Sequence, residues 1–245
     1  NKNGLNWYDY GARHYDAALG RFVSIDRFAE KYPLLSPYQY AANNPVVNVD
    51  VNGDSVRVYT ETDSYGHSWL STGEGEDMVV YSYGRFNGTY KGQKGINFAN
   101  GLGNGDGVLL RMTGLEAEEY MSDKESLDMD AFVITDVSDK EVNEMLDAKF
   151  YSSDKLPDNP KSIYYNAPYA HIIDSYKLLD NNCTTFVSDV LNQLNSNALE
   201  TVKVYPIGVN DFYTIPVKER FILPFSLQQH LNQNLKGNGV IHKIR

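Results

Sequence analysis

The feature that most constrains this chain is an apolar pattern that follows its single cysteine, Cys183. Apolar residues recur there at steps of three and four, which predicts a helix that begins near the cysteine and buries one face. Asn181 or Asn182 is a suitable N-cap, which places Cys183 in the first turn, where free backbone N–H groups favour an anion. The apolar residues are Phe186, Val187, Val190, Leu191 and Leu194.

The position of Cys183 has two interpretations. At a helix N-terminus with a cationic neighbour, the pKa of a thiol falls from about 8.5 to roughly 3.5–7.5, which produces a nucleophile at neutral pH. Alternatively, Cys183 is a small hydrophobic residue that packs under the helix. The asparagines before it and the threonines after it indicate a polar setting and favour the nucleophile.

Composition excludes several classes of function. The 245 residues carry a net charge of −10, which repels a phosphate backbone, so we expect no nucleic-acid substrate. One cysteine allows no internal disulfide and no CxxC zinc pair, and HExxH and GxxxxGK[ST] are absent, so we expect no metal and no cofactor. The sequence contains no run of 18 apolar residues, so we expect no membrane span. The chain starts at Asn1, so we expect a fragment or a processed product.

Residues 1–54 differ in texture from the rest of the chain. Tyrosines alternate with glycine, asparagine and proline, which predicts short strands and turns without a long helix. Several separated motifs here resemble, in order and spacing, the terminal core segment of Rhs (YD-repeat) proteins. These motifs are Tyr8-Asp-Tyr-Gly-Ala-Arg-His-Tyr-Asp-Ala-Ala-Leu-Gly-Arg-Phe-Val-Ser-Ile-Asp26, Ala29-Glu-Lys-Tyr32, Ser36-Pro-Tyr-Gln-Tyr40, Asn43-Asn-Pro45 and Asp50-Val-Asn-Gly-Asp54.

The Rhs resemblance implies that residues 1–54 end the shell of a polymorphic toxin and that residues 55–245 are its effector domain. It implies as partners the Rhs shell, a secretion machinery such as type VI, and a cognate immunity protein. The effector is then delivered into a target bacterium, with the periplasm favoured over the cytosol. Another interpretation is that residues 1–54 form an interaction platform that stays attached to the effector.

The same resemblance implies an aspartyl autoprotease. In Rhs proteins two aspartates near the end of this segment release the toxin, and by motif they correspond to Asp26 and Asp50, with a cut near Asp54. The family usually has Asp-Pro at both places, whereas Arg27 and Val51 follow them here. Without the resemblance, both aspartates are interpreted as turn caps.

The effector part is predicted to begin with strands. Residues 65–70 and 77–83 form a hairpin around the turn 73–76, after a first strand at 56–59. If the turn is centred between Glu74 and Gly75, His67 lies opposite Ser82 and points to the same face of the sheet. A slip of one residue brings Tyr83 there instead.

The remaining segments complete a mixed α+β pattern. The glycine-rich residues 84–107 are interpreted as a mobile loop beside the site, and the acidic residues 116–130 as a solvated face without function. Ser138 and Glu141 form a capping box that opens a helix through Phe150. Residues 169–176 lead into the cysteine helix. A strand at 202–205, an aromatic-rich loop, a helix at 225–235 and a strand at 240–244 follow.

A cysteine nucleophile needs a base, and five histidines are available. His67 follows a glycine at the start of a strand, a position from which its side chain can reach a helix N-terminus. His171 is the alternative because residues 169–176 bring it, with Tyr176, toward the cysteine helix. We interpret the other three as structural. They are His14, His230 and His242.

Three short motifs together resemble the permuted papain-like cysteine hydrolases, which include some cell-wall amidases and lecithin:retinol acyltransferase-like enzymes. The resemblance implies an antiparallel sheet packed on a cysteine-bearing helix, with Cys183 as nucleophile, His67 as base and a polar residue on the adjacent strand, here Ser82, as the third member. The motifs are Gly66-His67-Ser-Trp-Leu70, Tyr81-Ser-Tyr-Gly84 and Asn181-Asn-Cys183-Thr-Thr-Phe186.

The chemistry that this resemblance implies is acyl transfer. The backbone N–H of Cys183 and a donor from Asn181, Asn182 or Tyr176 hold the oxyanion, and His67 protonates the leaving group. Peptidoglycan peptide is the leading substrate. An ester or lipid-acyl hydrolase, a cytosolic protease, and a binding module with a buried Cys183 are the alternatives.

Overall fold

The computed structural model describes residues 7–9, 14–25, 36–38, 56–63, 66–88, 104–125, 127–206, 212–235 and 239–245. The chain divides into two compact units, Asn1–Ser55 and Val56–Arg245. In the first unit, the strands β1 (Trp7–Asp9), β2 (His14–Asp16) and β3 (Arg21–Phe22) form an antiparallel sheet. Its described part consists of short strands and a turn closed by Gly20 at φ +65°, which agrees with its composition.

The second unit is built on a seven-stranded antiparallel sheet in the order β12-β8-β4-β5-β6-β7-β9. Together with the four α-helices in the described part of this unit, the sheet confirms the α+β class. The strands are β4 (Val56–Glu61), β5 (His67–Thr72), β6 (Val79–Gly84), β7 (Asn104–Thr113), β8 (Met129–Ile134), β9 (Ala170–Lys177) and β12 (Ile241–Lys243).

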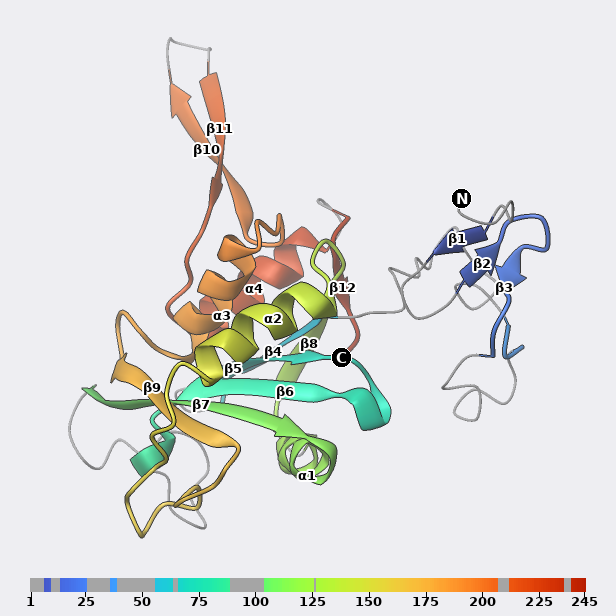
Figure 1. Ribbon diagram of the computed structural model, residues 1–245. Helices are drawn as coiled ribbons and strands as arrows, with labels where there is room; N and C mark the ends of the chain where they lie inside the picture. The colour runs from blue at the N-terminus through green and yellow to red at the C-terminus, as the bar shows by residue number, and fades with distance from the viewer. Residues whose placement is uncertain are drawn as a thin grey trace. The chain divides into compact units, whose positions relative to one another are not determined.

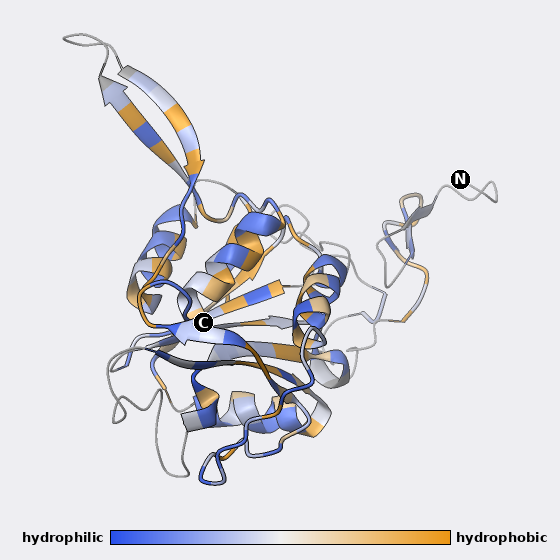
Figure 2. Ribbon diagram, turned by 60° about the vertical axis from the view of Figure 1, so that its left-hand side comes forward, coloured by the Kyte–Doolittle hydropathy of each residue, from blue (hydrophilic) through white to orange (hydrophobic). Residues whose placement is uncertain are grey.

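Helices cover both faces of this sheet (Figure 1). On one face lie α2 (Asp139–Phe150), α3 (Cys183–Gln193) and α4 (Pro224–Asn234), whereas α1 (Gly114–Glu125) lies on the other. Hydrophobic and hydrophilic residues intermix along these helices (Figure 2), as expected for elements that bury one side only. Among the described residues, no helix is long and apolar enough to cross a membrane.

Alternation along β5 decides which core each of its side chains joins. Leu70 packs in the core under α2, α3 and α4, whereas Trp69 packs in the core under α1. Successive side chains of a strand point to opposite faces, so Ser68 belongs to the α3 side and His67 to the α1 side. Ser68 and His67 therefore lie on opposite faces of the sheet, and this placement determines the geometry of the candidate site.

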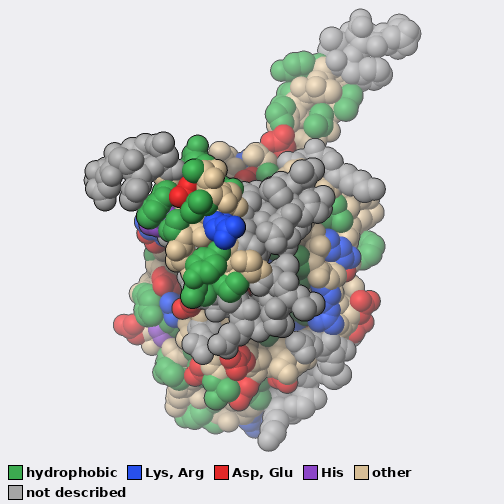
Figure 3. Space-filling model, turned by 90° about the vertical axis from the view of Figure 1, so that its right-hand side faces the viewer, with side chains coloured by type: hydrophobic (Ala, Val, Ile, Leu, Met, Phe, Trp, Pro, Cys, Tyr) green, Lys and Arg blue, Asp and Glu red, His purple; other side chains and the backbone are tan. Residues whose placement is uncertain are grey.

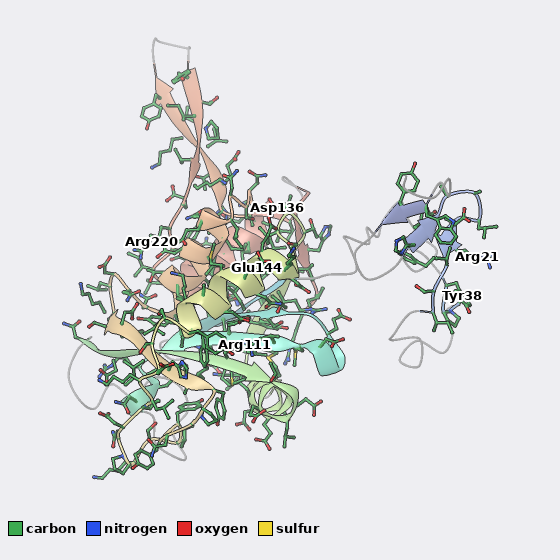
Figure 4. All side chains as sticks on the ribbon, in the orientation of Figure 1. Arg21, Tyr38, Arg111, Asp136, Glu144 and Arg220 are labelled. Carbon is green, nitrogen blue, oxygen red and sulfur yellow. The ribbon has the colours of Figure 1, made fainter. Side chains whose placement is uncertain are left out.

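Two predicted helices form because local signals fix their starts. The capping box of Ser138 and Glu141 opens α2, as predicted, and Asn182 caps α3 by accepting hydrogen bonds from the amides of Thr184 and Thr185. Arg111 of β7, labelled in Figure 4, also connects α2 to the sheet. Its Nε lies 2.7 Å from Oδ1 of Asp147 in α2.

A two-stranded arm extends from the second unit beyond the C-terminal end of α3 (Figure 1). It pairs β10 (Glu200–Pro206) with β11 (Phe212–Lys218), from Glu200 opposite Lys218 to Pro206 opposite Phe212. Hydrophobic side chains are visible along this arm (Figure 3). The aromatic-rich loop that we predicted after residues 202–205 therefore contains a strand, a correction that follows from the alternating Tyr213, Ile215 and Val217.

Two further predictions need correction. Residues 104–107 of the glycine-rich stretch belong to β7 rather than to a loop, while residues 89–103 lie outside the described part. The acidic stretch is not a featureless solvated face, because it contains α1 and β8. The side chains of α1 that face the sheet recur at helical spacing, but the many acidic residues between them made this pattern hard to recognise in the sequence. They are Ala117, Tyr120, Met121 and Lys124.

Candidate active site

The hairpin of β5 and β6 brings His67 to Ser82, although its register differs from the predicted one. Leu70 lies opposite Tyr81 and Thr72 opposite Val79, because the short 3-10 turn η3 (Gly75–Asp77) shifts the turn centre by one residue. The register therefore moves by two, and a shift of two preserves the face. His67 and Ser82 are diagonal neighbours rather than opposite, and Nε2 of His67 lies 2.7 Å from Oγ of Ser82.

The His67 ring is enclosed by aromatic residues. It stacks on Trp69 at 5.7 Å and meets the edge of Phe86 at 5.8 Å, and only 4% of the residue is exposed. Burial, with a smaller contribution from the charge of Lys124, lowers the pKa of His67 well below 6.5. At neutral pH this histidine is therefore uncharged.

Ser82 makes a second contact that the sequence analysis missed. Its Oγ lies 2.9 Å from the hydroxyl of Tyr120, which α1 supplies. Lys124 of the same helix forms an ion pair with Glu61 at 2.9 Å, and both side chains are largely buried. The acidic stretch, interpreted from sequence as a solvated face without function, therefore contributes through α1 to the surroundings of His67.

Cys183 is the first residue of α3, as predicted, but its thiol is not acidified. Burial has the largest effect and raises the pKa above the ordinary cysteine value, whereas the backbone N–H groups of Ser68, Thr184 and Cys183 and the hydroxyl of Thr184 lower it by less. Only 4% of Cys183 is exposed. Because desolvation penalises a thiolate more than these donors stabilise it, Cys183 rests as a neutral thiol.

Cys183 and His67 approach the same end of β5 from different sides. β5 pairs with β6 only over Leu70–Thr72, and ahead of this pairing the N–H of Ser68 faces the thiol of Cys183 and lowers its pKa. Oγ of Ser68 lies 3.3 Å from Oγ1 of Thr184. The residues that follow His67 and Cys183 in the chain are therefore in contact. Nδ1 of His67 has no hydrogen-bond partner among the described residues, so the thiol and the imidazole do not hydrogen-bond in this structure.

Both asparagines before the cysteine have structural roles instead of the predicted oxyanion role. Nδ2 of Asn181 donates to the hydroxyl of Tyr83 and to the carbonyl of Ser175, each at 2.9 Å. Nδ2 of Asn182 donates to the carbonyls of Leu178 and Ile222. An amide group has two donor hydrogens, so neither asparagine retains one for an oxyanion.

Tyr176 and Tyr83 pack together beneath α3. Their rings stack at 5.9 Å, and Tyr83 also stacks on Phe186 at 5.0 Å. The hydroxyl of Tyr83 donates to Asp174 at 2.5 Å. Tyr83 therefore does not replace Ser82 beside His67, since it lies on the opposite face. Burial and the neighbouring Cys183 raise the pKa of Tyr176, which keeps its hydroxyl protonated near the thiol.

The alternative base, His171, does not reach the cysteine. Its Nδ1 lies 2.9 Å from the carbonyl oxygen of Phe150, and its ring stacks on that residue at 3.9 Å. His171 lies in β9, the edge strand of the sheet, and contacts the C-terminal end of α2 rather than the start of α3.

The other three histidines were interpreted as structural. His230 has a structural contact, because its Nε2 lies 2.9 Å from the carbonyl oxygen of Ala198. His14 packs near Trp7 in the first unit, and His242 lies in β12.

Two of the predicted residues cannot be placed. Asp26 and Asp50, the predicted autoprotease pair, and the cut site near Asp54 lie outside the described residues. Within the described part, no three histidine, cysteine, aspartate or glutamate side chains gather as a metal site.

Comparison with known proteins gives one short similarity. The chain is 48% identical over 46 residues to Salivary gland surface protein 1 of Aedes aegypti, which covers 19% of this chain and 1% of that protein. No protein-family model matches the chain. No solved structure matches it either. The segment shared with the mosquito protein is too short to show a family.

Proposed function

We propose that the unit Val56–Arg245 is a cysteine hydrolase in which Cys183 is the nucleophile and His67 the base. One observation carries the proposal. Ser68, next to His67, contacts Thr184, next to Cys183, with 3.3 Å between their hydroxyl oxygens, and the His67 ring is held by Ser82 through Nε2, which leaves Nδ1 uncommitted. A nucleophile, a base and a group that orients the base are therefore contributed by neighbouring elements.

The neutral resting state determines the order of proton transfers. Cys183 Sγ attacks a carbonyl carbon while Nδ1 of His67 takes the thiol proton, so no thiolate needs to exist beforehand in the dry site. The imidazolium then gives this proton to the leaving amine or alcohol. Water attacks the acyl-enzyme with His67 as base, which releases the acid and restores the thiol. Hydrogen bonds between a nucleophile and its base are often long in the free enzyme and shorten only when substrate binds.

The oxyanion is assigned to backbone donors. Asn181 and Asn182 are committed to structural hydrogen bonds, so the N–H of Cys183 at the start of α3 is the donor that the local structure supports. Removal of one such donor typically costs about 3 kcal/mol in other enzymes. A backbone N–H cannot be removed by a side-chain substitution, which makes this arrangement tolerant of change.

The proposed substrate is an amide, with peptidoglycan peptide first, and the proposed setting is delivery into a competing bacterium. Support for the setting is the Rhs resemblance of residues 1–54, which also implies the shell, the secretion machinery, an immunity protein and release through Asp26 and Asp50. The net charge of −10 suits a cell-wall or peptide substrate better than a nucleic acid. Esters and lipid acyl groups are compatible with the same chemistry.

A non-catalytic binding module is the second candidate. It is favoured by the burial of both Cys183 and His67, each 4% exposed, and by pKa shifts that keep both uncharged. In that case the two residues are polar members of neighbouring cores. The two candidates differ in what happens when either side chain is replaced.

Bacterial growth separates the candidates. The 245-residue chain is expressed in the cytosol or exported to the periplasm, with Cys183→Ala, His67→Gln and, as a matched control in the same helix, Ser188→Ala. The hydrolase predicts lysis from the periplasm that both site variants abolish and the control retains. Toxicity that survives the loss of Cys183, in soluble and folded protein, would contradict the hydrolase and favour the binding module.

A further inference from the structure

Three side chains from three elements form a continuous row of hydrogen bonds beneath α1. Nε2 of His67 lies 2.7 Å from Oγ of Ser82, and the same Oγ lies 2.9 Å from the hydroxyl of Tyr120. Ser82 is fully buried and His67 is nearly so. A hydroxyl group carries one hydrogen and accepts others, so this row can run in either of two directions.

The direction of the row sets the tautomer of His67. If Tyr120 donates to Ser82 and Ser82 donates to Nε2, the ring proton is on Nδ1, and His67 cannot take a proton from Cys183. If Nε2–H donates to Ser82 and Ser82 donates to Tyr120, Nδ1 keeps its lone pair and can act as base. Only the second direction supports the proposed reaction, and it is also the direction that an imidazolium requires.

Ser82 alone cannot stabilise the second direction, in which Nε2–H of His67 donates to its Oγ. When Ser82 accepts from Nε2–H, its own hydrogen needs an acceptor, because an unpaired hydroxyl in a water-free core is costly. Tyr120 is the partner that the structure gives it besides His67.

We propose that Tyr120 is a positioning residue that acts through Ser82 to hold His67 in the tautomer with its proton on Nε2. This inference rests on the proposed function and deepens it. It also explains how a serine can occupy the third position, where a serine by itself orients an imidazole weakly.

The packing of α1 supports this role. The ring of Tyr120 meets Trp69 nearly edge-on at 6.0 Å, and Ala117 is completely buried one turn before it. Lys124, one turn after it, forms its ion pair with Glu61 and lies 5.3 Å above the Trp69 ring. Contacts before and after Tyr120 therefore fix the helix, so the position of its hydroxyl does not depend on the hydrogen bond alone.

The test measures the His67 tautomer directly, by nitrogen NMR of the full chain at about pH 8, where His67 is neutral. The wild type is expected to carry its proton on Nε2. Tyr120→Phe keeps the ring but removes the acceptor, so Ser82 donates to Nε2 and the proton is expected to move to Nδ1. The matched control is Tyr164→Phe, because Tyr164 packs on Phe86 on the same side of the sheet without a hydrogen bond to Ser82.

Activity gives a second, separable readout. With a small amide substrate, Tyr120→Phe is expected to lower kcat/KM about tenfold, whereas Tyr164→Phe leaves it unchanged. An unchanged tautomer in folded Tyr120→Phe overturns the proposal, even if Cys183→Ala confirms the hydrolase. If Cys183→Ala leaves activity intact while the tautomer still moves, the hydrolase fails and the row of hydrogen bonds stands.

A double variant checks that Tyr120 acts through Ser82 rather than directly on His67. Ser82→Ala interrupts the row at its centre, so adding Tyr120→Phe to Ser82→Ala is expected to change neither the tautomer nor kcat/KM any further. A further loss in the folded double variant, equal to the loss that Tyr120→Phe causes alone, would show that Tyr120 acts by another route and would overturn the proposal.

Discussion

Ser68 and Thr184 meet through their hydroxyl groups, with Oγ of the first 3.3 Å from Oγ1 of the second. This contact joins the sheet to the start of α3. Ser68 follows His67 and Thr184 follows Cys183, so the contact brings together the segments that carry the proposed base and nucleophile. Cys183 is itself only 4% exposed, and the first prediction follows from this dry environment.

Alkylation of Cys183 should be slow at neutral pH. Because burial raises the pKa of its thiol, the rate with iodoacetamide should rise with pH only above the ordinary cysteine range near about 8.5. The rate–pH profile of the native chain, measured by mass spectrometry, checks this. Protein unfolded in urea is the control and should react as a free thiol does. Rapid native labelling at about pH 7 would show that the thiol is ionised and accessible.

Folding stability should fall as the pH drops below about 6.5. Burial lowers the pKa of His67 in the folded state, so below 6.5 the unfolded chain binds a proton that the folded chain does not. The contribution of His67 to the free energy of unfolding is complete above pH 6.5 and is lost as the pH falls toward the pKa of the folded state. Over this range the free energy of unfolding changes by up to about 1.4 kcal/mol per pH unit.

Urea unfolding of wild type and His67→Gln between about pH 7.5 and pH 5 measures this contribution. The variant should lose less stability on acidification than the wild type does. It should keep some dependence, because burial also lowers the pKa of His230. Parallel curves for the two proteins would mean that His67 is not desolvated.

Gly107→Ala should destabilise the second unit by about 1–3 kcal/mol, the usual cost of overpacking. A Cβ at this position would collide with the hydroxyl of Tyr83 and with Oδ1 of Asp174. These two groups form the hydrogen bond that secures β6 to β9. Thermal unfolding tests the prediction, and Gly88→Ala is the matched control because nothing lies within 4 Å of its added carbon. Equal losses in both variants would refute the steric explanation.

Asn182→Ala should destabilise the chain by about 1–2 kcal/mol through loss of the α3 cap. Asn182→Asp keeps the oxygen that accepts from the amides of Thr184 and Thr185, but loses the Nδ2 donor to Leu178 and Ile222. The aspartate variant should therefore retain more stability than the alanine variant, and chemical unfolding distinguishes them. If Asn182 instead serves the oxyanion, both variants slow the reaction while stability is unchanged.

Much of the second unit could be predicted because its signals are local. The starts of α2 and α3 depend on side chains that bond amides two or three residues away, as Ser138 and Asn182 do. The shared face of His67 and Ser82 could be predicted despite the wrong register, since alternation survives a shift of two. Helix α1 was missed because its apolar face is narrow and its surroundings are acidic.

By itself, the sequence determined that Cys183 starts an amphipathic helix and that His67 and Ser82 share a face of one hairpin, because both features follow from backbone periodicity and capping. Only the tertiary structure decided that the thiol is desolvated, that Asn181 and Asn182 are committed to structural bonds, and that Tyr120 reaches Ser82. The physical reason is that burial, pKa and the use of donors depend on residues distant in sequence, which local patterns do not report.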